Sequence, residues 1–171
     1  MAYSLYDASV KMANGALGSL EGILTIAEQQ PNSEALISAR LVEDMNPLSF
    51  QVYYAALSAE RVAALLSGQE YELPSSDIGT YEEMHSRIAR ALEQLKKVDR
   101  EKANAIGDTL VMTDTPQGRQ EVPVNHVISI RDMTNLYFHV GMTYAILRKE
   151  GVPVGKRQWT RPYLSEFAGM E

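Results

Sequence analysis

The chain has 171 residues, of which 45% are hydrophobic and 22% are charged, and its formal net charge at pH 7 is −6. This apolar content excludes an intrinsically disordered chain, and the excess of carboxylates argues against proteins that bind nucleic acids or anionic membranes. Cysteine is absent, which excludes disulfides, thiolate metal ligands and a cysteine nucleophile.

Membrane and export signals are missing from the sequence. No stretch reaches the roughly 18 to 20 apolar residues of a membrane span, and the amino end lacks a signal-peptide pattern. We therefore expect a cytoplasmic protein with no membrane partner and no nucleic-acid partner.

Apolar residues in steps of three and four predict a first long helix over residues 5–29. They are Val10, Ala13, Leu17, Leu20, Leu24 and Ala27. Ser4 or Asp7 is a suitable N-cap for this helix. Three glycines lie inside it, at positions 15, 18 and 22. Either they let another backbone approach closely, as in a homodimer, or the helix simply tolerates them at a cost of about 1 kcal/mol each.

Two further long helices follow a short helix and turn that we expect over residues 32–45. Asn46 and Pro47 suit the N-cap and first position of a second long helix, over residues 47–67, which ends at Gly68. Thr80 and Glu83 form the pattern of a capping box and predict a third long helix over residues 80–98.

The last third of the chain changes pattern. Residues 109–112 and 120–124 are prone to form strands and flank a segment, residues 115–118, with the signature of a type II turn, so we expect a small β-hairpin. A fourth long helix is predicted over residues 126–150, with Ile130 on its apolar face, and the tail over 152–171 is expected to be irregular. Since four amphipathic helices must bury their apolar faces together, the sequence predicts an all-α four-helix bundle in a single domain.

Three segments carry a resemblance to a known family. They are SLYDASV at residues 4–10, ARLVEDMNPLSFQV at 39–52 and YFHVGMTYAILRKEGVPVGKRQW at 137–159. The chain resembles an uncharacterised bacterial and fungal family, a domain of unknown function within the DinB/YfiT-like helical-bundle superfamily. This resemblance implies a four-helix bundle with a hairpin before the last long helix, and it implies no particular activity.

The wider superfamily often holds a divalent metal with three histidines, one from the second helix and two from the fourth. This sequence departs from that pattern, because its second helix has no histidine and Ile130 stands where many relatives have one of the other two. His126 and His139 are 13 positions apart, which places them about 140° apart around a straight helix. We therefore expect neither a bound metal nor another cofactor, and we expect His85 and His126 at the surface.

His139 remains the best candidate for chemistry. It shares a polar row of the fourth helix with Asn135 and Thr143, and Asp44, Gln51 and Tyr54 form a second row if the second helix extends back that far. If the rows meet, His139 and Asp44 make a general base and its orienting carboxylate, with Gln51, Tyr54, Asn135, Thr143 and Trp159 contacting the substrate. The alternative interpretation is a structural hydrogen-bond network.

Three functions follow from these observations. The first is a small-molecule enzyme or binder with a pocket between helices, performing a metal-independent isomerisation, cyclisation or dehydration. The second is a non-catalytic bundle that acts as a dimerising scaffold or ligand carrier, and we expect a homodimer. The third, a thiol-dependent transferase, is implied only by analogy with the superfamily.

Overall fold

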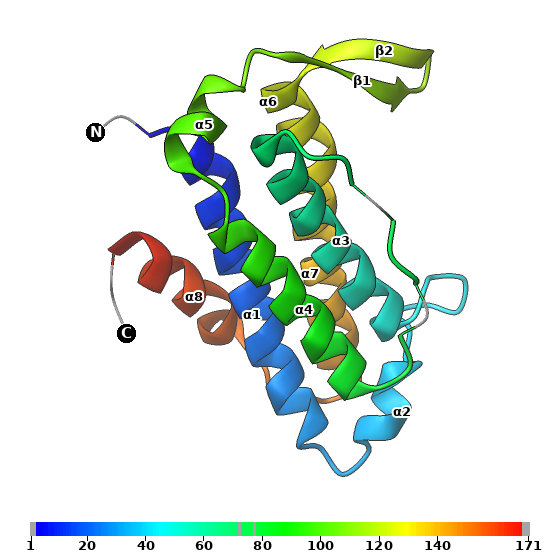
Figure 1. Cartoon of the computed structure of the whole chain (residues 1–171). Helices are drawn as coiled ribbons and strands as arrows, with labels where there is room; N and C mark the ends of the chain where they lie inside the picture. Colours follow the sequence, from blue (N-terminus) through cyan, green and yellow to red (C-terminus); the bar gives the residue numbers. More distant parts are fainter. Residues whose placement is uncertain (1–2, 72, 77, 169–171) are drawn as a thin grey trace.

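The computed structural model describes residues 3–71, 73–76 and 78–168, and most of these residues are helical (Figure 1). The elements in chain order, with η for a π-helical turn, are η1 (Asp7–Lys11), α1 (Met12–Glu28), α2 (Ser33–Ile37), α3 (Leu48–Ser67), α4 (Tyr81–Lys96), α5 (Arg100–Ala105), β1 (Leu110–Thr115), β2 (Gly118–Pro123), α6 (Val124–Val127), η2 (Ile128–Asp132), α7 (Met133–Lys149) and α8 (Lys156–Ala168). All four long helices predicted from the sequence are present, as α1, α3, α4 and α7 with their flanking turns.

The ends of these helices follow from local chemistry. The capping box is confirmed, because the Thr80 hydroxyl accepts from the Glu83 amide at 3.2 Å and the Glu83 carboxylate accepts from the Thr80 amide at 3.0 Å. Gly68 ends α3 with a left-handed φ of 63°, as expected. The start of α3 differs by one residue, since Pro47 itself is the N-cap and Leu48 is the first helical residue.

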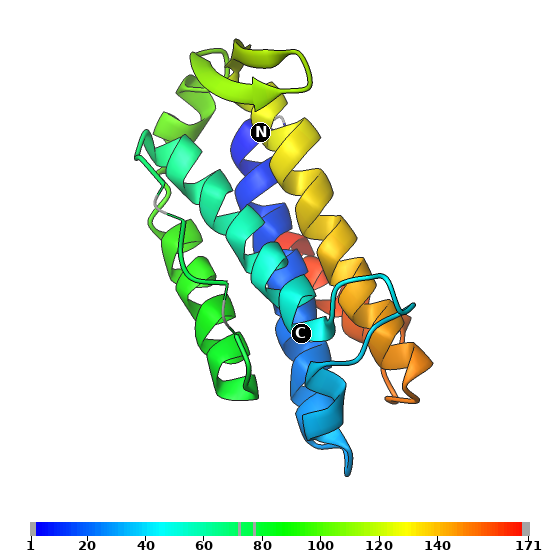
Figure 2. The same cartoon turned by 90° about the vertical axis from the view of Figure 1, so that its right-hand side faces the viewer.

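The four long helices run side by side, with the hairpin at one end and α2 at the other (Figures 1 and 2). Helix α3 packs against α4 and α7, while α1 packs against α4, α7 and α8. The apolar faces meet in one core of fully buried side chains, among them Leu17, Leu24, Val52, Val62, Ile88, Leu95, Val140 and Leu147. No helix of the described residues is long and apolar enough to cross a membrane.

One apolar position was predicted wrongly. Ile130 is 71% exposed, whereas Ile128 is buried in its place. Both lie in the π-helical turn η2, which connects α6 to α7. A π-helical turn adds a residue to the helix and shifts the face that the preceding residues present, and a regular 3.6-residue period cannot anticipate that shift.

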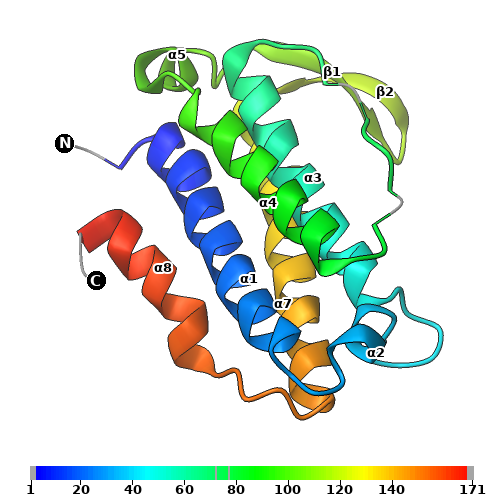
Figure 3. The ribbon, with the colours of Figure 1, turned by 60° about the horizontal axis from the view of Figure 1, so that its bottom comes forward.

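The carboxyl-terminal tail is a helix rather than the irregular segment we expected. Helix α8 lies along α1 (Figure 3), and the hydroxyl of Ser19 on α1 donates to the carbonyl of Trp159 at 2.6 Å. A Cβ built on Gly18 would lie 2.9 Å from Pro162, so this glycine makes room for α8. Gly15 and Gly18 thus serve a contact within the chain, and at these two positions the argument for a dimer loses its support, whereas Gly22 has no such contact. Residues 169–171 of the predicted tail lie outside the described residues.

The predicted hairpin is present, with β1 and β2 paired antiparallel and Thr115 opposite Gly118. Its turn is not of type II, because that type needs a positive φ at Gln117 and only glycines have positive φ among the described residues. The positive φ of 103° falls instead on Gly118. A turn without positive φ followed by such a glycine resembles the type I turn with a bulge found in three-residue hairpin loops.

Candidate functional site

His139 of α7 faces Gln51 of α3, and both side chains are buried. The imidazole Nδ1 lies 2.8 Å from Gln51 Oε1. The other end of the amide is fixed, because Gln51 Nε2 donates to the Asn46 carbonyl at 2.9 Å. A carbonyl oxygen only accepts hydrogen bonds, so Nδ1 carries the proton and Nε2 carries the lone pair.

The Nε2 atom of His139 is a hydrogen-bond acceptor that the described part of the chain leaves unused. None of the described residues donates a hydrogen bond to this atom. It keeps some contact with solvent, since it is not one of the fully buried side-chain atoms that lack a hydrogen-bond partner. Burial lowers the pKa of His139 to about 4, because the charged imidazolium loses its hydration there. At neutral pH the ring is therefore uncharged, with one tautomer fixed by Gln51.

Aromatic side chains surround this imidazole. The ring centroid of Tyr54 lies 4.5 Å from that of His139, Phe138 lies 5.1 Å away and Phe50 lies 6.1 Å away. Phe138 is 53% exposed, so this aromatic group extends from the buried ring to the molecular surface. Large apolar rings beside a single oriented acceptor are the elements from which ligand sites are built.

The His139 imidazole has no hydrogen bond to three other predicted site residues, Asp44, Asn135 and Thr143. Asp44 is exposed and precedes α3, which does not extend back to it, so the expected shared face with Gln51 does not exist. The Thr143 hydroxyl donates to the His139 carbonyl at 2.9 Å, and the Asn135 amide donates to the Arg131 carbonyl at 2.7 Å. These two side chains stay on their own helix and bind its backbone.

Trp159 does not join His139. Its indole lies against Tyr144, with the ring centroids 5.9 Å apart, and a Cβ built on Gly141 would lie 3.8 Å from it. Gly141 is two residues beyond His139, which places it about 200° away around α7. Trp159 lines an apolar groove between α1, α7 and α8 instead.

The other two histidines match their expected places only in part. His126 is exposed in α6. His85 is half-buried between two carboxylates of α1. Its Nδ1 lies 2.8 Å from Glu21 Oε1, and its Nε2 lies 3.4 Å from Glu28 Oε2.

The histidine pattern of the DinB superfamily requires three ligands that converge. Here Gln51 offers only an amide oxygen to His139, and that oxygen already accepts the Nδ1 proton. Ile130 has no ligating atom and faces outward. Among the described residues no three His, Cys, Asp or Glu side chains come together. The side chains at this place therefore do not fit the superfamily's metal site.

Sequence reasoning missed a buried charged network between α3 and α4. Glu60 is fully buried, and one of its oxygens accepts from Arg87 at 2.6 Å and from the Tyr71 hydroxyl at 2.7 Å. Its other oxygen lies 3.4 Å from Arg90 Nε. Burial and the neighbouring Glu60 raise the pKa of Tyr71 above its usual value. The local signal was weak, because Glu60 and Arg87 stand beside the apolar faces of their helices, a position at which charged residues are usually solvated.

The chain is similar to a family of unknown function and to a DinB family member. The family model described as "Domain of unknown function (DUF1993)" matches residues 5–160. A crystal structure of a DinB family member from Shewanella denitrificans superposes with a TM-score of 0.80, at 29% sequence identity, over 91% of this chain and 90% of that one. No curated protein matches. Since the family model covers most of the chain, this protein belongs to the DinB-like family of unknown function DUF1993.

Proposed function

We propose that the protein binds a small organic molecule at His139, with Nε2 accepting a hydrogen bond from the ligand. The observation that carries this proposal is the fixed tautomer with an unused acceptor. Tyr54 and Phe138 would contact the apolar part of the ligand, and a donor such as a hydroxyl or amide would meet the imidazole. A phenol has both features in one small molecule.

The same atom is the one that would take a proton in an isomerisation, cyclisation or dehydration without metal. A pKa of about 4 makes the imidazole a weak base, because general bases work best when their pKa lies near the working pH. Gln51 orients the ring but, unlike the carboxylate expected from Asp44, it does not stabilise an imidazolium. These two points favour a binding role for His139 over that of a strong base.

The test follows the imidazole itself by NMR while phenol is added. We expect phenol to shift the Nε2 resonance of His139, and toluene, which has nearly the same size but no donor, to shift it much less. By calorimetry, which does not depend on the imidazole signal, the His139→Gln protein should bind phenol much more weakly than wild type, while His126→Gln, which removes the exposed histidine, should bind it as wild type does. Equal phenol binding by wild type and His139→Gln would contradict the proposal.

The finer features of the architecture belong to the same proposal. We infer one domain over residues 1–171, in which α1, α3, α4 and α7 form a DinB-type four-helix bundle and α8 is an addition. The burial of all four apolar faces in one core supports this arrangement. A single cooperative unfolding transition is expected by circular dichroism and tryptophan fluorescence, and two separate transitions would contradict it. Homodimerisation stays a prediction, which light scattering tests against the 19.0 kDa of one chain.

A further inference from the structure

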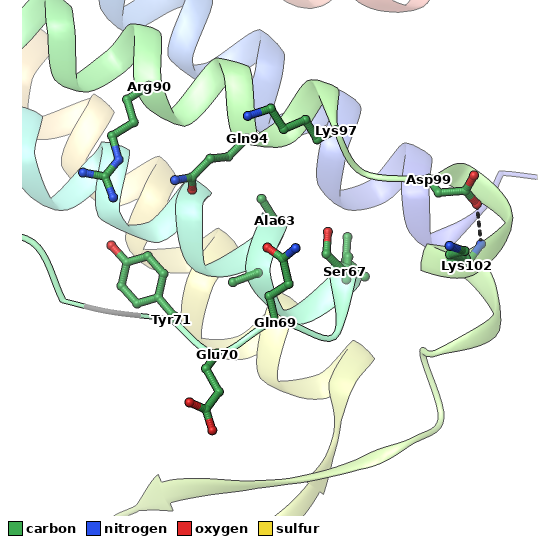
Figure 4. Close-up of a pocket in the computed structure, with 12 residues that line it drawn as sticks. Ala63, Ser67, Gln69, Glu70, Tyr71, Arg90, Gln94, Lys97, Asp99 and Lys102 are labelled. Carbon is green, nitrogen blue, oxygen red and sulfur yellow. Dashed lines mark hydrogen bonds between the residues drawn. The ribbon is translucent and has the colours of Figure 1, made fainter.

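A cavity lies on the other side of α3 from α7. It has a volume of about 630 Å³ and opens between the carboxyl-terminal half of α3, helix α4, helix α5 and the segment 69–71 (Figure 4). This volume is within the range of roughly 300–1,000 Å³ that is usual for small-molecule pockets. Figure 4 shows Arg90 and Gln94 reaching from α4 toward Tyr71 and Ala63.

Three cationic side chains line this cavity, namely Arg90, Lys97 and Lys102. Among the described residues, neither lysine side chain forms a hydrogen bond or a close ion pair, and Lys97 acts only at longer range on Glu93, whose pKa it helps to lower. A concentration of positive charge is unexpected on a chain with a net charge of −6. Since a concave surface focuses the field of the charges that line it, this cavity attracts anions.

Two acidic residues also line the cavity, so its lining holds three cations and two carboxylates and keeps one net positive charge. Asp99 is the N-cap of α5, and its Oδ1 accepts from the backbone amide of Lys102 at 2.8 Å (dashed line in Figure 4). The Glu70 carboxylate points away from Arg90 and Gln94. Asp99 thus holds the start of α5 while keeping its negative charge, and Glu70 is directed away from the cations of α4.

The buried wall behind the cavity has no net charge of its own, because Glu60 is paired with Arg87, and this leaves the charge of Arg90 to the cavity. Glu60 is the one carboxylate of the buried network, and it is matched by two guanidinium groups, those of Arg87 and Arg90. Arg87 lies closer, at 2.6 Å, and is buried with Glu60, whereas Arg90 lies 3.4 Å away and is 54% exposed. The Nη atoms of Arg90 form no hydrogen bond to the described residues, so they are free to meet an incoming oxyanion. A fully buried Glu60 oxygen that lacks a hydrogen bond faces Arg90 alone.

We propose that this cavity binds a small organic anion with two or more negative charges, a dicarboxylate, a tricarboxylate or a phosphate monoester. Arg90, Lys97 and Lys102 contact its oxyanions, and the amides of Gln69 and Gln94 donate further hydrogen bonds. The cations come from two separate helices, which suits charges spread over several ångströms. Ala63, Ala64 and Leu66 supply an apolar part of the wall for the carbon skeleton.

Isothermal titration calorimetry with citrate, inorganic phosphate and acetate tests this proposal on the full chain. We expect citrate to bind and acetate to bind far more weakly, because one carboxylate engages too few cations. Phosphate binding as tight as that of citrate would identify a phosphate monoester as the ligand class. Weaker phosphate binding would identify a polycarboxylate. Affinity should fall as salt is added, since screening weakens all three contacts.

The matched variants are Lys97→Gln and Lys96→Gln. They are adjacent and remove the same charge, but Lys96 pairs with Glu93 on the outer face and does not line the cavity. We expect Lys97→Gln to weaken citrate binding about tenfold and Lys96→Gln to leave it within about twofold, with both proteins equally stable.

Two results would overturn the proposal: no citrate or phosphate binding at millimolar concentration, or equal weakening by both lysine variants. The second would mean a general charge effect. His139→Gln should bind citrate as wild type does, so this proposal and the one at His139 fail independently.

Discussion

Gly15 of α1 lies directly against the ring of Tyr163 of α8, so closely that a Cβ added at Gly15 would overlap the ring. Gly22, about two helical turns further along α1, has no atom within 4 Å of the same built position. The two glycines of one helix therefore have different roles. Gly15 lets α8 pack, and Gly22 has no neighbour that requires it.

Substituting Gly15 by alanine should consequently destabilise the protein. Overpacking of this kind costs about 1–3 kcal/mol, because the ring and part of α8 must move. Gly22→Ala is the matched control, and it should stabilise the protein by up to about 1 kcal/mol through helix propensity alone. Urea unfolding of both variants measures the difference. In a Tyr163→Ala background the penalty of Gly15→Ala should largely vanish, and a penalty that persists would show that the ring is not its cause.

The sequence predicted the four long helices well, because their caps and periodicity agree. Thr80 with Glu83, and Gly68, are local signals that need no knowledge of the rest of the fold. It failed at α8, whose composition suggested an irregular tail and whose Pro162 argues against a helix. That helix is held by α1, and contacts between distant segments are not visible in local patterns.

The candidate site was predicted only in part, because a periodicity argument holds on regular helices and fails outside them. His139 and Gln51 do meet, as the spacing of the two polar rows indicated, because these two residues lie on regular helices. Asp44 lies in an exposed turn before α3, and a periodicity argument carried back beyond Pro47 had no helix to support it. Glu60 and Arg87 escaped notice because charged residues in an amphipathic helix are usually solvated, and only the facing of α3 and α4 buries this pair.

Removing Arg87 should be among the most damaging changes in the core. Arg87→Met leaves the fully buried Glu60 with only the more distant Arg90 as its ionic partner, and breaking a buried pair in this way costs about 3–5 kcal/mol. Adding Glu60→Gln to the same chain should recover part of this loss, because no unpaired charge then remains buried. Equilibrium unfolding of the single and double variants gives the comparison. A double variant less stable than Arg87→Met alone would contradict this account.

Gln51 should control the tautomer of His139. Gln51→Leu removes the acceptor of the Nδ1 proton and leaves that buried donor unpaired, which costs about 1–3 kcal/mol. Nitrogen chemical shifts of the imidazole report which ring nitrogen is protonated. We expect wild type to show one tautomer, with the proton on Nδ1, and Gln51→Leu to show a mixture. A single unchanged tautomer in both proteins would mean that another group fixes the ring.

The pKa of His139 should make the stability of the protein depend on pH in acid. The folded value of about 4 lies below the ordinary value of 6.5, so the unfolded chain binds a proton that the folded chain refuses. The stability linked to His139 is therefore fully present above about pH 6.5 and is lost as the pH falls from there toward 4. Over this window the loss amounts to about 3 kcal/mol, since one pKa unit corresponds to about 1.4 kcal/mol.

His139→Gln isolates this contribution from those of the carboxylates, which titrate in both proteins. We expect the free energy of unfolding of wild type to fall more steeply than that of His139→Gln between pH 6.5 and 4.5, with the two curves parallel above pH 7.5. Urea unfolding at several pH values measures the curves, and His126→Gln, which removes an exposed histidine, should follow wild type throughout. Parallel curves for wild type and His139→Gln over the acid window would show that the buried imidazole keeps an ordinary pKa. They would also remove the argument that His139 is neutral because it is buried, and with it the preference for binding over base catalysis.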